Sequence, residues 1–524
     1  MKLNAIVRNA VLFAVGCVPV FACSAPKYIA FAWEFNNSSP QELLKLADEF
    51  DKTPLDGVGI NLRAVAVVDG IKTNLSYRRF MHDPAWPKEA FADQIPHFQK
   101  LTRHKSMKHC FLSSFTAPRT RIDWTNDAEW ARLAKSMRTV AWVAKQGGLK
   151  GLYIDPEDYR NAFQFTRMAG ELEYDELCKL ARRRGRELFA PVFEEYPDVT
   201  LHFYWFMSHL NYYCRRDGGD PVRMVRLDES LWPAFLNGIL DVLPPGASIN
   251  DGDEQGYWFL ASKNGFRNGA YLFHHVYPKL VAPENLEKYR RQVRFVPPVY
   301  MEMYVNPKGV TWYKAPTAGS RLETLRLDLQ QASDVCGGYI WFWGEKHTWV
   351  KHRKGWRKGD PRIRDTTWAD ELPGLFRSME WARDRDALCE RELAALDGSE
   401  VNLAPHPEVI VGEENLKAAS KPFRDWERLG IFNAFVTNSV SAVKGGAWYA
   451  VSFDVKGCPP RFNVFFSDDK GKELAPTANF VYADKKRGIV RAPEGSASAT
   501  LVFGAKNAPG GKTVYSNVKF VEIK

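Results

Sequence analysis

The feature that most constrains the fold of this 524-residue chain is a regular alternation of short apolar runs and longer helical segments. Eight of the runs are rich in the β-branched and aromatic residues that favour strands. These candidate strands are residues 29–35, 58–63, 109–115, 151–155, 200–206, 247–251, 298–304 and 338–343. Segments with apolar residues at helical spacing lie between them, at residues 40–50, 126–146, 174–195, 231–242, 283–293 and 320–335.

Strands that alternate with helices form parallel βαβ units. Eight such units predict an α/β fold, the (β/α)8 TIM barrel, over residues 27–395. An open doubly wound sheet would carry a glycine-rich phosphate turn after its first strand, whereas this chain has Trp-Glu-Phe-Asn-Asn at residues 33–37. The pattern therefore favours the barrel.

The pattern changes near residue 396, after the last helical segment. Residues 400–524 contain short alternating strands separated by Gly, Pro and Asn turns. The strand-like runs are residues 448–455, 461–466, 488–491, 498–503 and 514–523. This spacing predicts a smaller all-β sandwich domain after the barrel.

Residues 1–25 have the pattern of a secretion signal peptide. Two basic residues accompany an apolar run over residues 10–20 that is too short to span a bilayer. Cleavage fits after Ala22 or after Ala25, and Cys23 after Val-Phe-Ala also resembles a bacterial lipoprotein box. We expect an exported bacterial protein that is periplasmic, extracellular or held at the outer membrane by a lipid on Cys23.

The charge pattern argues against nucleic acid as a partner. The chain has 72 Lys and Arg against 62 Asp and Glu, and its basic residues are scattered rather than clustered. The sequence contains no dinucleotide or P-loop fingerprint and no Gly-x-Ser-x-Gly, and His274 and His275 lack the spacing of a zinc hydrolase. We therefore expect neither a cofactor nor a metal.

Two carboxyl residues follow the fourth candidate strand. Asp155 and Glu157 stand two residues apart in Ile-Asp-Pro-Glu, so an extended backbone points both side chains the same way. Active sites of barrel enzymes lie at the carboxyl ends of the strands. One anion raises the pKa of its neighbour, which keeps a proton available at neutral pH. We expect this pair to be catalytic, although a loop that caps a helix is the structural alternative.

The seventh and eighth candidate strands add further polar groups. Glu302 lies in an apolar run with Tyr304 on the same face of the predicted strand, and a buried carboxylate there needs a partner or a function. Trp341, Trp343 and Glu345 occupy alternate positions of the last strand. Tryptophan rings at a site stack on sugar rings, although core packing is the open alternative for both.

Other polar and aromatic residues fall at the ends of candidate strands and would surround the same mouth. We expect the following residues to contact substrate: Trp33, Glu34, Asn61, Arg63, Trp205, Asp251 and Asp253. For the two aspartates, a solvated turn is the alternative.

Two short segments resemble the chitinase-like family of barrel glycoside hydrolases. Gly-Leu-Tyr-Ile-Asp-Pro-Glu at residues 151–157 is similar to that family's fourth strand, and Gly-Gly-Tyr-Ile-Trp at residues 337–341 is similar to its eighth. The resemblance implies Glu157 as acid/base, Asp155 as its partner and Trp341 at the pocket floor. The family's earlier acidic positions are Lys150 and Tyr153 here.

A second resemblance is to retaining barrel hydrolases, which use a Glu after the fourth strand as acid/base and a Glu on the seventh as nucleophile. Glu157 and Glu302 occupy these places, with Pro156 where that group has Asn. The C-terminal region is similar to the β-sandwich carbohydrate-binding modules that follow such barrels.

Carboxylates and Trp residues at one mouth are what glycoside hydrolysis requires. The sequence therefore predicts a glycosidase acting on a poly- or oligosaccharide, with Glu157 as acid and Glu302 or Asp155 as the second carboxylate. One alternative is a glycan-binding lipoprotein without turnover. Another is a metal-dependent hydrolase or lyase that uses Asp251, Asp253 and His residues.

Overall fold

The computed structural model describes most of the chain after the predicted leader. The described residues are 25–35, 38–68, 70–116, 120–157, 163–210, 220–254, 256–257, 265–316, 320–351, 365–412, 432–457, 460–474, 480–481, 486–507 and 511–523. The predicted cleavage site after Ala22 and the predicted lipid attachment at Cys23 lie outside them.

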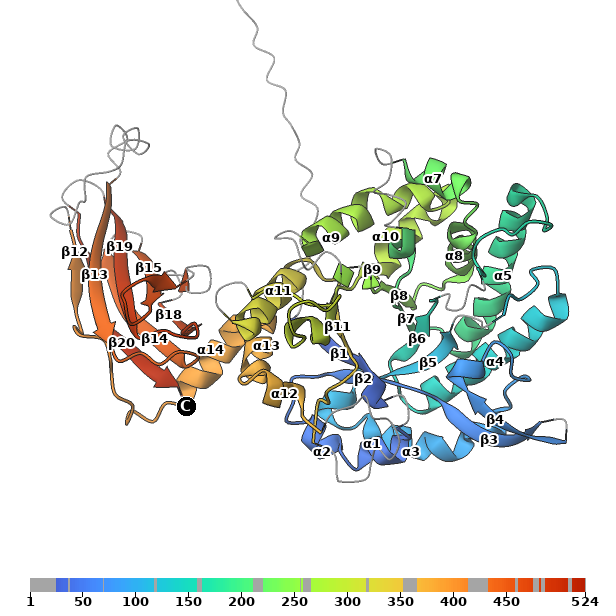
Figure 1. The fold of residues 1–524 in the computed structure, drawn as a ribbon, viewed down its shortest axis with the longest axis horizontal. Coiled ribbons are helices and arrows are strands. Elements are labelled where there is room, and N and C mark those ends of the chain that lie inside the picture. Colours follow the sequence, from blue (N-terminus) through green and yellow to red (C-terminus); the bar gives the residue numbers. More distant parts are fainter. Residues whose placement is uncertain are drawn as a thin grey trace, which may run out of the picture.

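Parallel strands form the centre of the larger domain (Figure 1). They pair in the order β10-β11-β1-β2-β5-β6-β7-β8-β9. Their bounds are Lys27–Ala32 (β1), Gly57–Ile60 (β2), Phe111–Thr116 (β5), Gly151–Asp155 (β6), Thr200–Phe203 (β7), Ser248–Asp251 (β8), Val293–Phe295 (β9), Pro298–Tyr300 (β10) and Tyr339–Gly344 (β11).

The two terminal strands in this order, β9 and β10, are consecutive in the chain and separated only by Val296 and Pro297. The Val296 N–H donates to the Asp251 carbonyl on β8 at 2.9 Å, and the Trp341 N–H on β11 donates to the Pro297 carbonyl at 3.1 Å. Residues 293–300 thus act as one seventh strand that pairs with β8 through its first half and with β11 through its second. The predicted (β/α)8 barrel is confirmed.

Helices surround these strands (Figure 1). Their bounds are Pro40–Leu44 (α1), Ala47–Phe50 (α2), Ile95–Leu101 (α3), Asp127–Gln146 (α4), Tyr174–Glu195 (α5), Pro221–Leu227 (α7), Trp232–Val242 (α8), Gly265–His275 (α9), Leu286–Gln292 (α10), Arg321–Val335 (α11), Trp368–Glu371 (α12), Leu375–Arg383 (α13) and Arg385–Ala394 (α14).

Helices α5 and α8 pack closely because each has a glycine at the contact. A Cβ atom on Gly185 would lie 2.2 Å from the Phe235 carbonyl oxygen, and one on Gly238 would lie 2.0 Å from the Arg182 carbonyl oxygen. The buried side of α5, which includes Leu188, lies toward the strands. This contact holds the outer helix layer firmly around the fourth and fifth strands of the barrel.

The predicted strand over residues 298–304 is wrong in its second half. Strand β10 ends at Tyr300, and Met301–Tyr304 form a 3-10 helix. The Glu302 side chain accepts two backbone N–H groups from the loop after β11, which favours a turn at this point. Glu302 and Tyr304 therefore do not share a strand face.

A hairpin absent from the sequence prediction follows β2. Strands β3 (Arg63–Val68) and β4 (Ile71–Ser76) pair with each other in an antiparallel register. Val65, Val67 and Ile71 on this hairpin are exposed. The alternation of exposed and partly buried residues along β3 is typical of a strand with one solvated face.

The C-terminal region is a sandwich of antiparallel sheets. One sheet has the order β12-β20-β14-β18, and the other has β13-β19-β15-β16, with β17 paired to β15. The bounds are Val409–Val411 (β12), Phe432–Ser441 (β13), Trp448–Gly457 (β14), Pro460–Ser467 (β15), Glu473–Leu474 (β16), Phe480–Val481 (β17), Arg487–Arg491 (β18), Ser498–Asn507 (β19) and Thr513–Ile523 (β20). The predicted all-β sandwich is confirmed.

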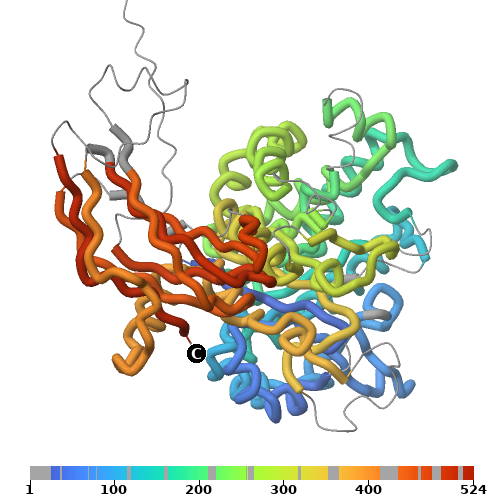
Figure 2. Tube along the Cα trace, turned by 60° about the vertical axis from the view of Figure 1, so that its left-hand side comes forward, coloured from blue at the N-terminus to red at the C-terminus, as the bar shows by residue number. Residues whose placement is uncertain are grey.

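The sandwich lies to one side of the barrel and contacts it through α14 (Figure 2). Trp448 and Ile489 of the sandwich belong to the same buried apolar cluster as Leu388 of α14. An ion pair between Glu390 and Arg487 also joins the two domains. The contact therefore combines apolar packing with charge pairing.

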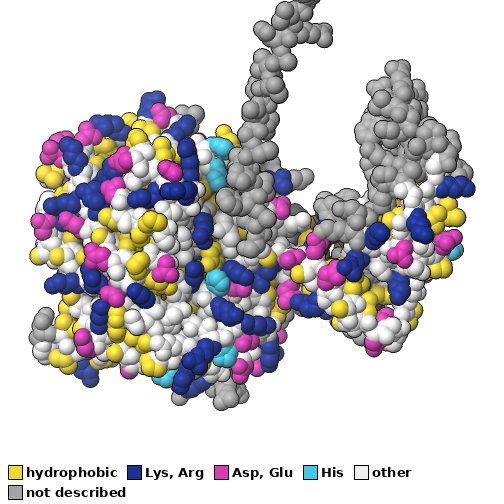
Figure 3. Space-filling model, turned by 180° about the vertical axis from the view of Figure 1, so that it is seen from behind, with side chains coloured by type: hydrophobic (Ala, Val, Ile, Leu, Met, Phe, Trp, Pro, Cys, Tyr) yellow, Lys and Arg dark blue, Asp and Glu magenta, His cyan; other side chains and the backbone are white. Residues whose placement is uncertain are grey.

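Basic, acidic and apolar side chains are interspersed over the face of the barrel seen in Figure 3. This mixture agrees with the scattered basic residues of the sequence. Within the described ranges, no helix combines the length and the apolar character needed to cross a bilayer.

Candidate active site

Five carboxyl side chains from the carboxyl ends of four barrel strands form the candidate site. We call them the carboxylate row, and its members are Glu254, Asp155, Glu157, Glu345 and Glu302. Asp155 ends β6, Glu157 and Glu254 follow β6 and β8, Glu302 follows β10 and Glu345 follows β11. Electrostatic repulsion links neighbours along the row, as the following paragraphs describe. The barrel topology thus brings together residues that are up to 190 positions apart.

Asp155 and Glu157 are the centre of the row. The Glu157 N–H donates to Asp155 Oδ1 at 3.1 Å, which fixes the turn that leaves β6. Burial raises the pKa of Asp155, and the bond from Glu157 offsets part of this rise. Burial also raises the pKa of Glu157 strongly, and repulsion from Asp155 and Glu345 raises it further. Glu157 therefore retains its proton at a higher pH than Asp155 does.

Glu254 extends the row on the β8 side. Its N–H donates to the Tyr204 carbonyl at 3.0 Å, which ties it to the end of β7. Burial, and then repulsion from Glu157 and Asp155, raises its pKa well above the ordinary value. Gly252 makes this turn feasible, because a Cβ there would lie 2.5 Å from the Phe203 carbonyl oxygen. Three carboxyl groups therefore interact around Glu157.

Glu302 and Glu345 form the β11 side of the row. Glu302 Oε1 accepts the N–H groups of Glu345 at 2.6 Å and Lys346 at 2.8 Å. Burial raises the pKa of Glu302 to about 7, although these two donors oppose the rise. Glu345 Oε1 accepts the Trp343 indole N–H at 3.2 Å. Glu302 thus holds the loop that carries Glu345.

Aromatic rings form the floor beneath the row. Tyr204 stacks on Trp341 with ring centroids 4.8 Å apart and an interplanar angle of 9°, and it also stacks on Tyr153. Trp341 donates its indole N–H to the Gly252 carbonyl at 2.7 Å. Tyr257 packs against Tyr300 with centroids 5.2 Å apart. The floor is thus a packed layer of the barrel core.

Four of the predicted substrate contacts have buried side chains that make other interactions in the structure. Trp341 is 0% exposed, so its ring belongs to the core and offers no stacking face. The Tyr304 hydroxyl donates to Asp328 Oδ2 at 2.6 Å, away from the row. Asp251 accepts the Phe206 N–H at 2.9 Å and the Ser208 N–H at 3.0 Å, so it holds the loop after β7. Glu34 accepts the Trp349 N–H at 2.9 Å.

The remaining predicted contacts lie at strand ends with differing exposure. Trp33, Trp205 and Trp343 are partly exposed, and Trp205 stacks on His209. Asn61 is buried and accepts the Tyr153 hydroxyl.

Arg63 begins the β3–β4 hairpin and is exposed. Asp253 is buried, with a backbone φ of 42° in the turn that carries Glu254. Neither residue belongs to the carboxylate row.

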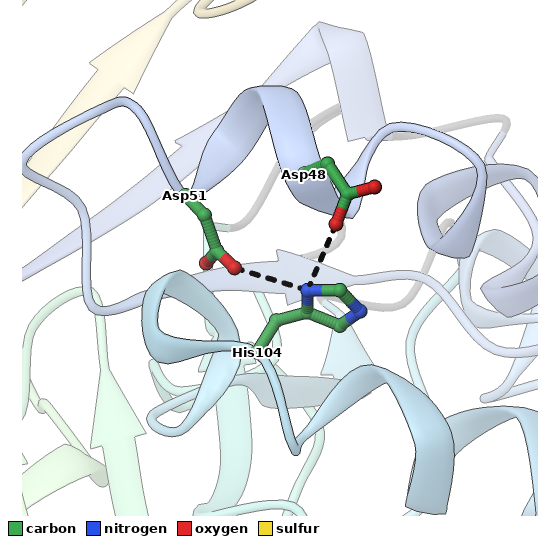
Figure 4. Close-up of side chains that lie close together, drawn as sticks. All are labelled: Asp48, Asp51 and His104. Atoms are coloured by element: carbon green, nitrogen blue, oxygen red, sulfur yellow. Dashed lines mark hydrogen bonds and ion pairs between the residues drawn. The ribbon is translucent and has the colours of Figure 1, made fainter.

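One group of ligand-type side chains could hold a metal ion within the described part of the chain. It consists of Asp48, Asp51 and His104, whose side chains point toward one another (Figure 4), and it includes no member of the row. His104 Nδ1 is 3.0 Å from Asp51 Oδ2, and Asp51 Oδ1 accepts the Ser106 N–H at 2.9 Å. These bonds tie α2 to the loop after α3, which accounts for the group as a structural contact.

Sequence reasoning did not include Glu254, Tyr257 and Tyr300 among the site residues. Glu254 stands in an Asp-Gly-Asp-Glu stretch where a solvated turn was the competing interpretation. A signal in the sequence could have identified Glu254: it stands three residues after the end of β8, and Gly252 permits a tight turn between the strand and Glu254.

No protein-family model matches the chain, and no curated protein resembles it in sequence. Solved structures give weak likenesses. A GH5_18 protein from Streptomyces cattleya, solved with GlcNAc, is 10% identical, covering 73% of this chain and 84% of its own, with a TM-score of 0.40. A glucosidase from Croceicoccus marinus is 10% identical over 96% of both chains, with a TM-score of 0.38. The 3-keto-D-glucoside 4-epimerase YcjR from E. coli is 12% identical, covering 68% and 99%, with a TM-score of 0.32. The chain's own strand order is that of a (β/α)8 barrel, followed by a β sandwich.

Proposed function

We propose that this protein is a glycoside hydrolase in which Glu157 is the general acid. The observation that carries the proposal is the Asp155–Glu157 pair at the end of β6, with burial and two neighbouring carboxyl groups raising the pKa of Glu157. A carboxylic acid that keeps its proton near neutral pH can donate it to a glycosidic oxygen.

Asp155 supplies the charged partner in this proposal. It shares the strand end with Glu157 and accepts its N–H, so the two carboxyl groups are held in a fixed relation. The glycosidic C–O bond breaks as the Glu157 proton passes to the leaving oxygen. Asp155 stabilises the positive charge that develops at the sugar carbon, and water completes the reaction.

Glu302 is a positioning residue in this mechanism rather than the nucleophile. Both backbone donors on its Oε1 come from the loop that presents Glu345. Glu345 repels Glu157 directly and raises its pKa. Glu302 therefore acts on the acid through Glu345.

The test is sugar release from a panel of polysaccharides and aryl glycosides by the full chain. Because general acid catalysis contributes about 100- to 10,000-fold, Glu157→Gln should lower kcat by that factor. Asp48→Asn is the matched control, since Asp48 is an exposed acid outside the row. Unchanged hydrolysis in Glu157→Gln would refute the assignment. Glycan binding without sugar release in the unmodified chain would favour the non-catalytic glycan-binding protein.

We also propose that the protein is exported, on the basis of its N-terminal sequence pattern. Cell fractionation with Cys23→Ser beside the unmodified chain tests the lipid anchor. Loss of membrane association in the variant is expected for a lipoprotein, whereas unchanged recovery in a soluble extracellular or periplasmic fraction contradicts the anchor.

A further inference from the structure

Three aromatic rings meet at the carboxyl ends of the sixth and seventh barrel strands. We call Tyr257, Tyr300 and Trp312 the aromatic wall. Tyr257 follows β8, Tyr300 ends β10, and Trp312 stands in the loop after Met301–Tyr304. Both tyrosines are 5% exposed, whereas Trp312 is partly exposed. The wall therefore consists of two rings that are packed inside the structure and one ring that a ligand can reach.

The two tyrosines fix the plane of the Trp312 indole. The Trp312 ring lies 5.3 Å from the Tyr300 ring at an interplanar angle of 83°, and 6.0 Å from the Tyr257 ring at 85°, as measured between centroids. The two tyrosine rings are 5.2 Å apart and tilted by 32°. Edge-to-face contacts of this kind stabilise aromatic pairs. The indole is therefore held in one plane by two neighbours.

Hydrogen bonds hold the backbone of the same loop. The buried Asn306 side chain donates from Nδ2 to the Trp312 carbonyl at 3.0 Å. Two residues after Trp312, the Lys314 N–H donates to the Met303 carbonyl at 3.0 Å. A side chain that is already fixed loses little conformational freedom when a ligand binds, and this favours affinity. The Trp312 ring is therefore suited to binding a rigid partner.

Asn306 also joins the Trp312 loop to the carboxylate row. Its Oδ1 accepts from Lys346 Nζ at 3.3 Å, and the Lys346 backbone N–H donates to Glu302 Oε1 at 2.8 Å. The same Glu302 oxygen accepts the Glu345 N–H. The loop that carries Trp312 and the loop that carries Glu345 are thus one hydrogen-bonded unit. A ligand that contacts Trp312 is thereby placed in a defined relation to the row.

We propose that Trp312 is the platform on which a sugar ring of the substrate stacks, with Asn306 as its positioning residue. A pyranose ring presents C–H groups on one face, and a partly exposed indole at a binding site can cover such a face. The ligand class is therefore a glycan held through the C–H face of a pyranose ring. Two tryptophans that the sequence suggested for this role have other contacts: Trp341 is fully buried, and Trp205 stacks on His209. The inference rests on the proposed glycosidase function and concerns the same site.

The experiment measures KM and kcat of the full chain and its variants on the polysaccharide of the panel that is cleaved best. We expect Trp312→Leu to raise KM roughly three- to tenfold and to change kcat less than about twofold, because stacking holds the ground state and the transition state alike. Trp312→Phe keeps an aromatic face and should raise KM only about twofold. Stacking involves no charge, so the rise in KM should be the same in low and high salt.

Trp142→Leu is the matched control. Trp142 is a partly buried indole on the outer helix α4, with Lys88 Nζ 5.3 Å from its ring centroid. This variant loses the same side chain at a place outside the mouth. Its KM should equal that of the parent.

Calorimetric titration separates the platform from the hydrolase. The hexasaccharides of the panel polysaccharides are titrated into Glu157→Gln with and without Trp312→Leu. Weaker binding in the double variant supports the platform, even if no glycan is cleaved, a result that would refute the hydrolase itself. Cleavage with unchanged KM and unchanged affinity in Trp312→Leu would overturn the platform and leave the hydrolase assignment intact.

Two further results also decide the proposal. A fall in kcat with unchanged KM would overturn it, because Trp312 would then only support the loop that holds Glu345. If Trp312→Leu does not fold, Trp312→Phe supplies the test, and a KM equal to that of the parent would overturn the platform.

Discussion

Asp241 on the outer helix α8 and the carboxylate row at the barrel mouth are both acidic regions, but their surroundings differ. Asp241 Oδ2 accepts from Arg182 Nε and Arg186 Nη1, each at 2.8 Å. Burial alone would raise its pKa, but bonds from Arg182, Asn285 and Arg186 lower it below the ordinary value. In the row, burial raises every pKa whose shift is resolved, and like charge adds to the rise for Glu157, Glu254 and Glu302.

Arginines thus neutralise Asp241 on an outer helix, whereas among the described residues no ion pair reaches the carboxylate row. Groups whose pKa is raised by burial and by like charge are typical of catalytic sites. Substitutions at three positions test this difference.

After the loss of kcat expected for Glu157→Gln, the next largest effect on activity concerns Glu302. Glu302→Ala removes the acceptor for the N–H groups of Glu345 and Lys346, so we expect kcat to fall about tenfold through misplacement of the loop. Glu302→Gln keeps an oxygen in that place and should restore most of the rate. Steady-state kinetics on the same substrate measure both. If the Gln variant loses as much activity as the Ala variant, Glu302 has a charge-dependent catalytic role, as in the retaining-hydrolase interpretation.

The second effect concerns the stability of the outer helices. Asp241→Asn removes the charged partner of Arg186 and one of the two charged partners of Arg182, which keeps Glu284. We expect a melting temperature lower by roughly 4 °C at pH 7 with kcat unchanged. The Asp241 pKa is lowered, so its stabilisation exists above the unfolded value and is lost as pH falls. The difference between variant and parent should therefore shrink as the pH falls below about 3.9, the ordinary pKa of Asp. A loss that does not shrink in acid would assign the effect to packing.

The smallest effect is a gain in stability, expected for Glu157→Gln at high pH. The Glu157 pKa is raised in the folded chain, so the folded state holds its proton more tightly and loses stability as pH rises above about 4.3. Glu157→Gln removes this penalty. Its melting temperature should exceed that of the parent by on the order of 2 °C at pH 9, with no gain at pH 4. A variant that is less stable than the parent at pH 9 would show that the carboxylate is stabilised there.

Strong local patterns made part of this structure predictable. Strand β6 and helix α5 have the predicted bounds, because a short apolar run and a long amphipathic segment each have one consistent periodicity. The turn over residues 301–304 could not be predicted, since Glu302 finds its partners in a loop more than 40 residues away. Trp341 and Asp251 were assigned to substrate because sequence does not show which strand-end side chains face inward.

The break within the seventh strand has a consequence for the dimensions of the site. Glu254 is attached on the β8 side of this break, while Glu345 and Glu302 are attached on its β10–β11 side. Pro297 and Pro298 have no backbone N–H to donate, so at this break the strand accepts a hydrogen bond instead, from the Trp341 N–H to the Pro297 carbonyl. The two halves of this strand thus pair with different neighbours, β8 and β11, and the backbone between them separates the attachment of Glu254 from that of Glu302 and Glu345. A substitution at Val296 or Pro297 would therefore change the relative positions of these carboxyl groups without altering any of them.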